Sequence, residues 1–409
     1  MPVQQVFMIA ATAFMLAAAV FRNVPNLQFM AGVTVALPIV AYAACRLGLR
    51  GLECRRKAPQ RVFEGSDFTV SLRVRNGGRM PKFFLRVSDA LPEWFASDSY
   101  LSFAIPAAWP GKRLEFAYQA RAEKRGVFAV GPASVQTSDP VGLFQAQKSL
   151  SERTEMVVYP TPLPFDAQQR GGGHAFGTIE TERPAVAGRG FEFATIREYR
   201  PGDEQKRIHW KSTARLGKLA VVEFEQSFAR DVAICLDARA GTELGEGKKT
   251  TLEVAVKAAA SLAGFAIRHG ASASLDFSDA AGPHSVRASN RDEINAIYEA
   301  LARANADGAE RIGAVLKRMA AQVNPGSLAM AATGDLDESL IEVAARWSAR
   351  RVHLCVLLLD AQAFAGRPPG EDGVPAFAAA LSRAGASVQI LGPDDDLAAA
   401  LRRIGYAAI

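Results

Sequence analysis

One short segment, residues 188–226, concentrates the polar and aromatic residue types that binding and catalysis commonly use. Its centre contains the runs Arg-Glu-Tyr-Arg-Pro-Gly-Asp at 197–203 and Ile-His-Trp-Lys at 208–211. Residues 183–218 hold nine Lys or Arg and four Asp or Glu, a formal charge of +5 against +6 for the whole chain. Because a guanidinium binds carboxylates and phosphates through paired hydrogen bonds, this cluster predicts contact with an anionic partner.

Two interpretations of the segment stay open. In the first, it forms a docking face for an acidic protein surface or for anionic headgroups. In the second, Tyr199 and Trp210 pack against the neighbouring domain while the arginines pair with Glu198 and Asp203. Nucleic acid is not expected as a partner, because no nucleic-acid-binding fold accompanies the charge. The residues assigned to docking are Arg197, Tyr199, Arg200, Asp203, Arg207, His209, Trp210, Lys211 and Arg215.

Two aspartates suggest a second chemistry. Asp237 ends the apolar run at 232–236, and Asp335 follows another apolar run at 327–332. If both runs are parallel strands, the two carboxylates lie at the ligand-binding edge of one sheet and could hold a hydrated Mg²⁺ weakly. A metal-dependent ligand-binding or hydrolytic protein is therefore the alternative function. Otherwise Asp237 caps the turn that follows it, and no cofactor is expected.

Other catalytic sets are incomplete. Residues 241–250 lie between a strand and a helix, but Thr242 and Lys249 stand where a phosphate loop needs glycine and a hydroxyl residue. Cys235 and Cys355 lie in apolar runs, and the five histidines have no partner spacing for a nucleophilic pair. The chain is accordingly predicted not to be an enzyme.

The N-terminal region is apolar. Residues 3–21 and 29–45 carry no charge, and each approaches the length of about 20 residues that crosses a bilayer. Five basic residues follow the second segment within residues 46–57, whereas the short connection has only Arg22. The positive-inside rule then predicts a two-span hairpin with both termini and the bulk of the chain in the cytoplasm. Four cysteines without disulfide or zinc spacing fit that reducing compartment.

Two globular patterns follow the hairpin. Residues 68–75 alternate with period two, and further strands are predicted at 83–87, 113–119, 126–130, 133–137 and 155–159, which is typical of an antiparallel β-sandwich. Beyond residue 231, apolar runs alternate with helical patterns, which predicts a parallel sheet covered by helices. The predicted organisation is a transmembrane helical hairpin (1–48), a β-sandwich (49–164), a linker (165–187), the basic segment (188–230) and an α/β domain (231–409).

These parts resemble a known family. The runs at 197–203 and 208–215, with Arg-Gly-Val-Phe-Ala-Val-Gly-Pro at 125–132 and Ser-Asp-Pro-Val-Gly-Leu-Phe at 138–144, are similar to the domain of unknown function 58 family of bacteria and archaea. The resemblance implies a multi-pass protein of the inner membrane with a von Willebrand factor A-like, Rossmann-like C-terminal domain. It also implies that the protein acts together with a MoxR-type AAA+ ATPase.

One departure from that family's fold bears on the metal hypothesis. A von Willebrand factor A domain binds Mg²⁺ through Asp-x-Ser-x-Ser, but residues 237–241 here are Asp-Ala-Arg-Ala-Gly. Both serines are missing, and Arg239 places a positive charge near the expected cation. We therefore expect a non-enzymatic, membrane-anchored scaffold or adaptor for envelope-related assembly. The sequence predicts neither its client nor its oligomeric state.

Overall fold

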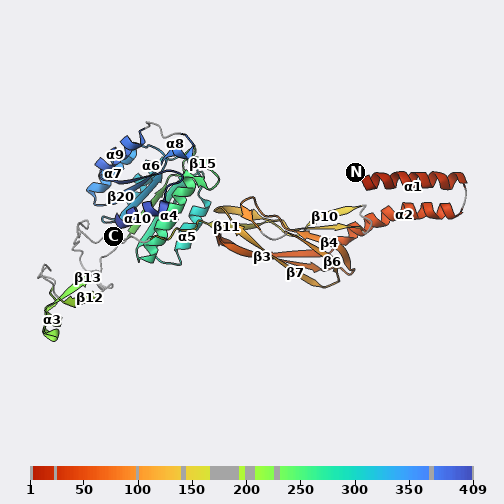
Figure 1. Cartoon of the computed structure of the whole chain (residues 1–409), viewed down its shortest axis with the longest axis horizontal. Coiled ribbons are helices and arrows are strands. Elements are labelled where there is room, and N and C mark those ends of the chain that lie inside the picture. Colours follow the sequence, from red (N-terminus) through yellow and green to blue (C-terminus); the bar gives the residue numbers. More distant parts are fainter. Residues whose placement is uncertain are drawn as a thin grey trace. The chain divides into compact units, whose positions relative to one another are not determined.

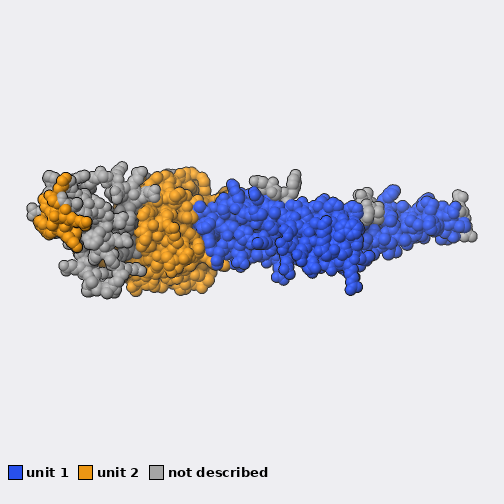
Figure 2. Space-filling view, turned by 90° about the horizontal axis from the view of Figure 1, so that it is seen from below, with its two compact units in different colours: residues 1–161 blue, residues 162–409 orange. Residues whose placement is uncertain are grey.

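The computed structural model describes residues 3–22, 25–97, 101–139, 144–165, 193–198, 208–224, 231–367 and 373–407. The chain divides into two compact units, residues 1–161 and residues 162–409, which Figure 2 colours separately. Unit 1 holds the N-terminal helices and the sandwich, and unit 2 holds the α/β domain (Figure 1).

Two apolar helices begin unit 1, α1 (Val3–Arg22) and α2 (Pro25–Gly48), and they pack against each other. By length and composition, α2 can cross a membrane. The described apolar part of α1, Val6–Phe21, is shorter than such a span. An N-terminal apolar helix is thus confirmed, while among the described residues only α2 has the dimensions of a span.

Antiparallel β-sheets follow, in the orders β1-β3-β7-β5 and β10-β9-β4-β6, with a smaller sheet β2-β11-β8 whose β2–β11 pair is parallel. The predicted alternation is confirmed, because Phe68, Val70, Leu72 and Val74 are all buried in the core. The strands are β1 (Leu52–Lys57), β2 (Arg61–Phe63), β3 (Asp67–Asn76), β4 (Lys82–Ser88), β5 (Phe95–Ala96), β6 (Ser102–Ala108), β7 (Arg113–Ala122), β8 (Gly126–Val130), β9 (Ser134–Ser138), β10 (Gln145–Ser149) and β11 (Thr154–Tyr159).

Inside this core lies a buried ion pair. The Arg56 and Asp89 side chains are 2% and 0% exposed and form paired hydrogen bonds, one of them from Nε at 3.0 Å. Arg56 also donates to the Val130 and Glu152 carbonyls, and the Tyr118 hydroxyl donates to Asp89 at 2.8 Å. Burial and the neighbouring carboxylate raise the pKa of Tyr118 far above its ordinary value. Each guanidinium nitrogen of Arg56 and each carboxylate oxygen of Asp89 therefore has at least one hydrogen-bond partner.

Unit 2 contains the predicted α/β sheet, in the order β18-β17-β14-β19-β20-β21. All neighbours are parallel except the edge strand β18, which the sequence analysis did not predict. The strands are β14 (Asp231–Leu236), β17 (Ser272–Asp279), β18 (Gly282–Ala288), β19 (Leu328–Thr333), β20 (His353–Leu359) and β21 (Ser387–Leu391), with a short hairpin of β15 (Gly245–Glu246) and β16 (Lys249–Thr250).

Helices cover both faces of this sheet (Figure 1). The alanine-rich α4 packs on β14, β17 and β19 with α5 and α10 beside it, and a second buried cluster joins the other face to α6, α7 and α9. The helices are α4 (Thr251–Arg268), α5 (Ile294–Arg303), α6 (Ile312–Met319), α7 (Ser339–Ala349), α8 (Ala361–Phe364), α9 (Val374–Arg383) and α10 (Leu397–Ala407).

A small β-α-β element lies in the basic segment. Strands β12 (Phe193–Glu198) and β13 (Ala220–Phe224) pair antiparallel, and α3 (Trp210–Leu216) lies between them in sequence. His209 begins the helix, because its Nδ1 accepts from the Ser212 amide at 3.2 Å, and Gly217 ends it with a φ of 69°.

Candidate functional site

Asp237 and Asp335 are joined at one edge of the α/β sheet. They follow the neighbouring parallel strands β14 and β19, and the Asp237 amide donates to Ala332 at 3.0 Å. Thr333 connects them: its hydroxyl donates to Asp237 Oδ2 at 2.6 Å and accepts from the Asp335 amide at 2.9 Å. The expected juxtaposition is therefore present, and it includes a hydroxyl residue that the sequence analysis did not assign. A threonine two positions before an aspartate at a strand end was the available signal.

Asp237 is almost fully buried, with 6% of its surface exposed. Burial raises the pKa of its carboxyl above the ordinary value, although hydrogen bonds from Thr333 and from the Arg239 amide oppose that effect. The Arg239 amide lies 3.2 Å from Asp237 Oδ1, as in a turn capped by an aspartate. Asp237 thus has the capping role that was the alternative to metal binding.

Arg239 provides the positive charge of the site. Its guanidinium Nη2 donates to Asp335 Oδ2 at 2.7 Å, and the two side chains are 23% and 27% exposed. Of the two other guanidinium nitrogens, Nε is buried and has no hydrogen-bond partner among the described residues. The arginine therefore neutralises Asp335 where a cation was considered, and its buried Nε donor stays unused.

The backbone that carries Arg239 is fixed from a distant loop. The Gly308 amide donates to Ala238 at 2.9 Å, and the Ala240 amide donates to Gly308 at 2.8 Å. A Cβ at Gly308 would lie 2.2 Å from the Ser278 carbonyl oxygen, so only glycine fits here. The position of Arg239 thus depends on a contact across about 70 residues of sequence that no local pattern predicts.

Residues 241–250 do not form a phosphate-binding loop. They form the β15–β16 hairpin, where Gly245 has a φ of 107° and its backbone approaches Lys249 closely. Thr250 caps α4 and donates to Glu243 at 2.9 Å. The two strand cysteines are buried, and burial raises the pKa of Cys355 to about 12, which disfavours a thiolate nucleophile.

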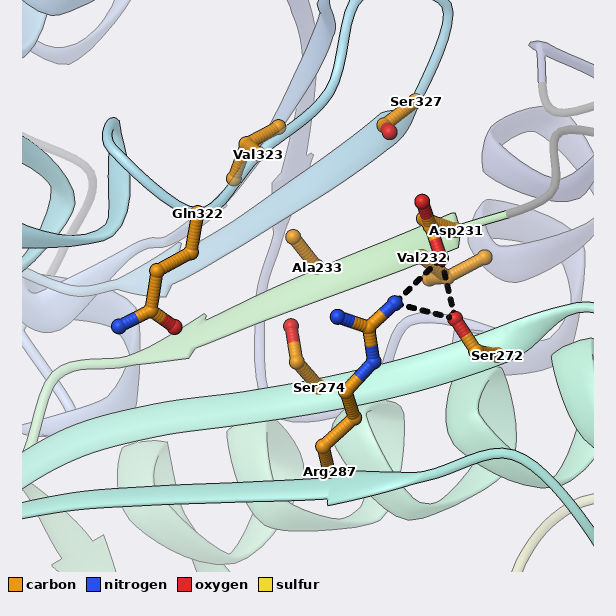
Figure 3. Close-up of a pocket in the computed structure, with 9 residues that line it drawn as sticks. All are labelled: Asp231, Val232, Ala233, Ser272, Ser274, Arg287, Gln322, Val323 and Ser327. Atoms are coloured by element: carbon orange, nitrogen blue, oxygen red, sulfur yellow. Dashed lines mark hydrogen bonds and ion pairs between the residues drawn. The ribbon is translucent and has the colours of Figure 1, made fainter.

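A small polar hollow lies near the opposite ends of the strands, where β14 and β17 begin (Figure 3). Arg287 donates to Asp231 at 2.7 Å and to Ser272 at 3.1 Å, and Asn324 donates to Asp231 at 2.9 Å. Although burial opposes them, hydrogen bonds to Asp231 from the Ser272 hydroxyl, Asn324 and Arg287, together with the Arg287 charge, hold the pKa of Asp231 below its ordinary value. The hollow measures about 20 Å³, room for roughly one water. Because its polar groups form hydrogen bonds with one another, they have a structural role.

The structure describes only part of the predicted docking set. Arg197 lies in β12, while Tyr199, Arg200, Asp203 and Arg207 lie outside the described residues. His209 caps α3, so its imidazole has a structural role. Trp210 is 68% exposed and does not have the buried environment of the packing hypothesis. Lys211 and Arg215 are also exposed on α3.

Comparisons with known proteins agree with the motif resemblance. Residues 195–362 match the family model "Protein of unknown function DUF58", a region that begins in β12 and ends in α8. The uncharacterized protein YeaD of Bacillus subtilis is 25% identical over 212 residues, which are 49% of this chain and 52% of YeaD. The chain thus spans about half the length of this relative.

Solved structures give only distant similarity. Part of native alpha-2-macroglobulin from Escherichia coli, from domain MG7 to the C-terminus, is 16% identical over 27% of this chain and 16% of that chain, with a TM-score of 0.19. A CARDB domain from Pyrococcus furiosus, solved in complex with di-metal ions, is 14% identical over 26% of this chain and 86% of that chain, with a TM-score of 0.18. These scores carry no conclusion about this chain.

Proposed function

Because the chain belongs to the family of proteins of unknown function DUF58, we propose that it is a non-enzymatic, membrane-anchored scaffold or adaptor. In this proposal it works with a MoxR-type AAA+ ATPase in envelope-related assembly, and its C-terminal domain is von Willebrand factor A-like, as the motif resemblance implies. The observation that carries the proposal is that the carboxylates of Asp237 and Asp335 both bind groups of the protein itself. Thr333 and the Arg239 amide bind Asp237, and the Arg239 guanidinium binds Asp335.

The exposed side chains of α3 support docking. Trp210, Lys211 and Arg215 combine a large apolar surface with two positive charges on one short helix. Tryptophan and arginine are the residue types that most often dominate the energy of protein interfaces. An acidic surface on the ATPase is therefore the expected partner for this helix.

The docking face is tested by binding of the purified full chain to the MoxR-type ATPase of the same genome. Trp210→Ala and Lys211→Glu are expected to weaken binding at least tenfold, because each changes an exposed group of α3. Arg291→Glu makes a matched charge change on an exposed residue of the α/β domain and should leave binding unchanged. Folded α3 variants that bind the ATPase as tightly as the unaltered chain contradict the proposal.

The membrane anchor is proposed as the two-span hairpin, with both termini in the cytoplasm. The apolar length of α2 and the basic residues that follow it support this topology. The full chain should then resist alkaline extraction from membranes. A reporter fused after residue 409 should have cytoplasmic activity, and one inserted at residues 23–24 should have periplasmic activity. Release of the chain by alkaline buffer rules out the anchor.

The alternative is a metal-dependent protein that uses Asp237 and Asp335. Their common contact with Thr333 favours it, because hydroxyl and carboxylate oxygens are ligands for Mg²⁺. Titration of the full chain with Mg²⁺ separates the two functions. The scaffold predicts no specific stabilisation, whereas a stabilisation that Asp237→Ala abolishes establishes the metal site instead.

A further inference from the structure

Exposed aromatic side chains gather at the end of the sandwich that adjoins α2. Phe83 and Trp109 are 47% and 56% exposed, and their rings meet edge to face with centroids 6.4 Å apart. Phe84 and Met80 in the same segment are 54% and 66% exposed. Large apolar side chains in such a group on a soluble surface indicate an interaction site. We call Met80, Phe83, Phe84 and Trp109 the aromatic patch.

The backbone of β4 is distorted to expose this patch. Phe84 has a φ of 53°, which is uncommon for a bulky residue. Strand side chains normally alternate between faces, but here Phe83 and Phe84 are both exposed, with buried Lys82 and Leu85 on either side. Backbone strain of this kind tends to occur at functional sites. The strain and the exposure together indicate a functional role for this outward aromatic pair.

The loops around the patch are tied to the end of α2. Lys82 Nζ donates to the Leu47 carbonyl at 2.6 Å, and the Gly77 amide donates to Gly51 at 2.8 Å. A Cβ at Gly51 would lie 3.0 Å from the Gly78 amide nitrogen, so the two turns touch.

The Trp109 turn joins the same assembly. The Asn76 side chain donates to the Met80 and Ala108 carbonyls at 2.9 and 2.8 Å, and the Gly111 amide donates to Asn76 at 2.8 Å. The patch is therefore held at the end of the one described helix that has the dimensions of a membrane span.

The charge around the patch is mostly basic, although the exposed Glu53 carboxylate lies beside Gly77 and 3.9 Å from Arg75. Residues 46–50, 77–81 and 109–112 contain four basic residues, Arg46, Arg50, Arg79 and Lys112, and no acidic residue. Tyr42 lies one helical turn before Arg46, whose Nε donates to its hydroxyl at 3.2 Å. Aromatic rings at the level of the headgroups, with basic residues beside them, are the pattern of a membrane interface.

We propose that the aromatic patch is a lipid-docking surface, which inserts Trp109 and the Phe83–Phe84 pair into the headgroup boundary of the membrane that α2 crosses. Arg79 and Lys112 bind anionic headgroups beside it. The patch thereby holds the sandwich against the bilayer, in addition to the hydrogen bonds that tie it to the end of α2. This inference rests on the proposed membrane anchor and adds an orientation to it.

The test uses the full chain, reconstituted in vesicles that contain lipid brominated on the acyl carbons nearest the headgroup. Bromine quenches tryptophan emission at contact. The emission of Trp109 is the difference between the unaltered chain and Trp109→Phe, and that of Trp94 is obtained likewise from Trp94→Phe. Trp94 is the matched control, because its carbonyl accepts from Glu123 just beyond the far end of β7, about 30 Å from Trp109.

We expect shallow brominated lipid to remove most of the Trp109 emission and to leave the Trp94 emission unchanged. The loss should be larger in vesicles with phosphatidylglycerol than with phosphatidylcholine alone. The variant Arg79→Glu with Lys112→Glu should reduce that excess, as should high salt.

Three outcomes overturn the inference. If the chain floats with the vesicles but Trp109 is not quenched, the docking surface is wrong and the anchor stands. If the chain does not float with the vesicles, the anchor fails and the docking surface fails with it. If Trp109 is not quenched at any protein-to-lipid ratio but its emission shifts as that ratio rises, a second copy of the chain covers the patch in place of lipid.

Discussion

Two arginine–aspartate pairs, one in each unit, differ in how completely their hydrogen bonds are used. In the sandwich, Arg56 and Asp89 are buried and bonded on every side, with Tyr118 and two carbonyls as further partners. In the α/β domain, Arg239 reaches Asp335 with one nitrogen, both side chains are about one-quarter exposed, and Nε has no partner among the described residues.

This difference separates a structural ion pair from a pair with a hydrogen-bond donor still available for a ligand. A buried pair is tolerated only when each polar atom is satisfied, which is the condition of the sandwich network. Arg239 and Asp335 lie at the sheet edge where α/β domains bind ligands, and they retain both solvent access and a free donor. Of the two pairs, only the second is open enough to solvent for a ligand to reach it.

The largest effect is expected from breaking the buried pair. Arg56→Met leaves the Asp89 carboxylate buried without its countercharge and should lower the free energy of unfolding of the sandwich by about 3–5 kcal/mol. The measurement is hydrogen exchange of β3 and β7 amides in the full chain. Arg73→Met is the matched control, because Arg73 and Glu115 pair at 2.6 Å but are 58% and 63% exposed. It should cost less than about 1 kcal/mol. Equal losses in the two variants contradict the contrast.

A smaller loss is expected at the α/β pair. Asp335→Asn removes the charge that faces Arg239 and should destabilise the α/β domain by about 1–2 kcal/mol, since solvent compensates part of the lost interaction. Amide exchange in β14 and β19 reports this change. The control is Asp394→Asn, because Lys249 and Asp394 also pair at 2.6 Å but are 68% and 82% exposed. A loss as large as that of Arg56→Met means that this pair is structural too.

Most of the helices and strands could be predicted from the sequence, but the two arginine–aspartate pairs could not. Alternation at 68–75 and apolar runs ending in aspartate are local signals, and the strands β3, β14 and β19 lie where those signals occur. Arg56, by contrast, was counted among the basic residues that follow a membrane span, yet it is buried against Asp89, 33 residues away. A pairing at that separation depends on sheet register, which composition does not specify.

The site at Asp237 and Asp335 could also be predicted only in part from the sequence. Arg239 was expected near Asp237 because the two are only two positions apart, but its contact with Asp335 spans 96 positions of sequence. The role of Gly308 was not predicted, since it depends on a backbone approach between two loops. For the basic segment, the prediction of docking remains a prediction, because four of its nine residues lie outside the described structure.

Replacing Arg239 tests whether its positive charge keeps a cation out of the site. Arg239→Ser leaves Asp237, Thr333 and Asp335 facing an uncompensated position, and we expect the variant to acquire a Mg²⁺-dependent stabilisation. At a Mg²⁺ concentration ten times the dissociation constant, this stabilisation should reach about 1.4 kcal/mol. Thermal unfolding with and without Mg²⁺ measures it. The unaltered chain and the double variant Arg239→Ser with Asp237→Asn are the controls, and neither should respond. If the single variant also fails to respond, the arginine is not what keeps a cation out.

The smallest effect concerns the protonation of Asp237. Burial raises its folded pKa above the unfolded value of 3.8, so the folded state holds this proton more tightly. The resulting stability is fully present below pH 3.8 and is lost as the pH rises through the raised folded pKa. Asp237→Asn does not titrate, and its stability relative to the unaltered chain should therefore increase over the same window. Unfolding measured from about pH 4 to pH 7 tests the sign, with the exposed Asp292→Asn as control. A relative stability that falls with rising pH instead means that the hydrogen bond from Thr333 and the Arg239 charge outweigh burial, and the site then prefers the carboxylate that a cation would need.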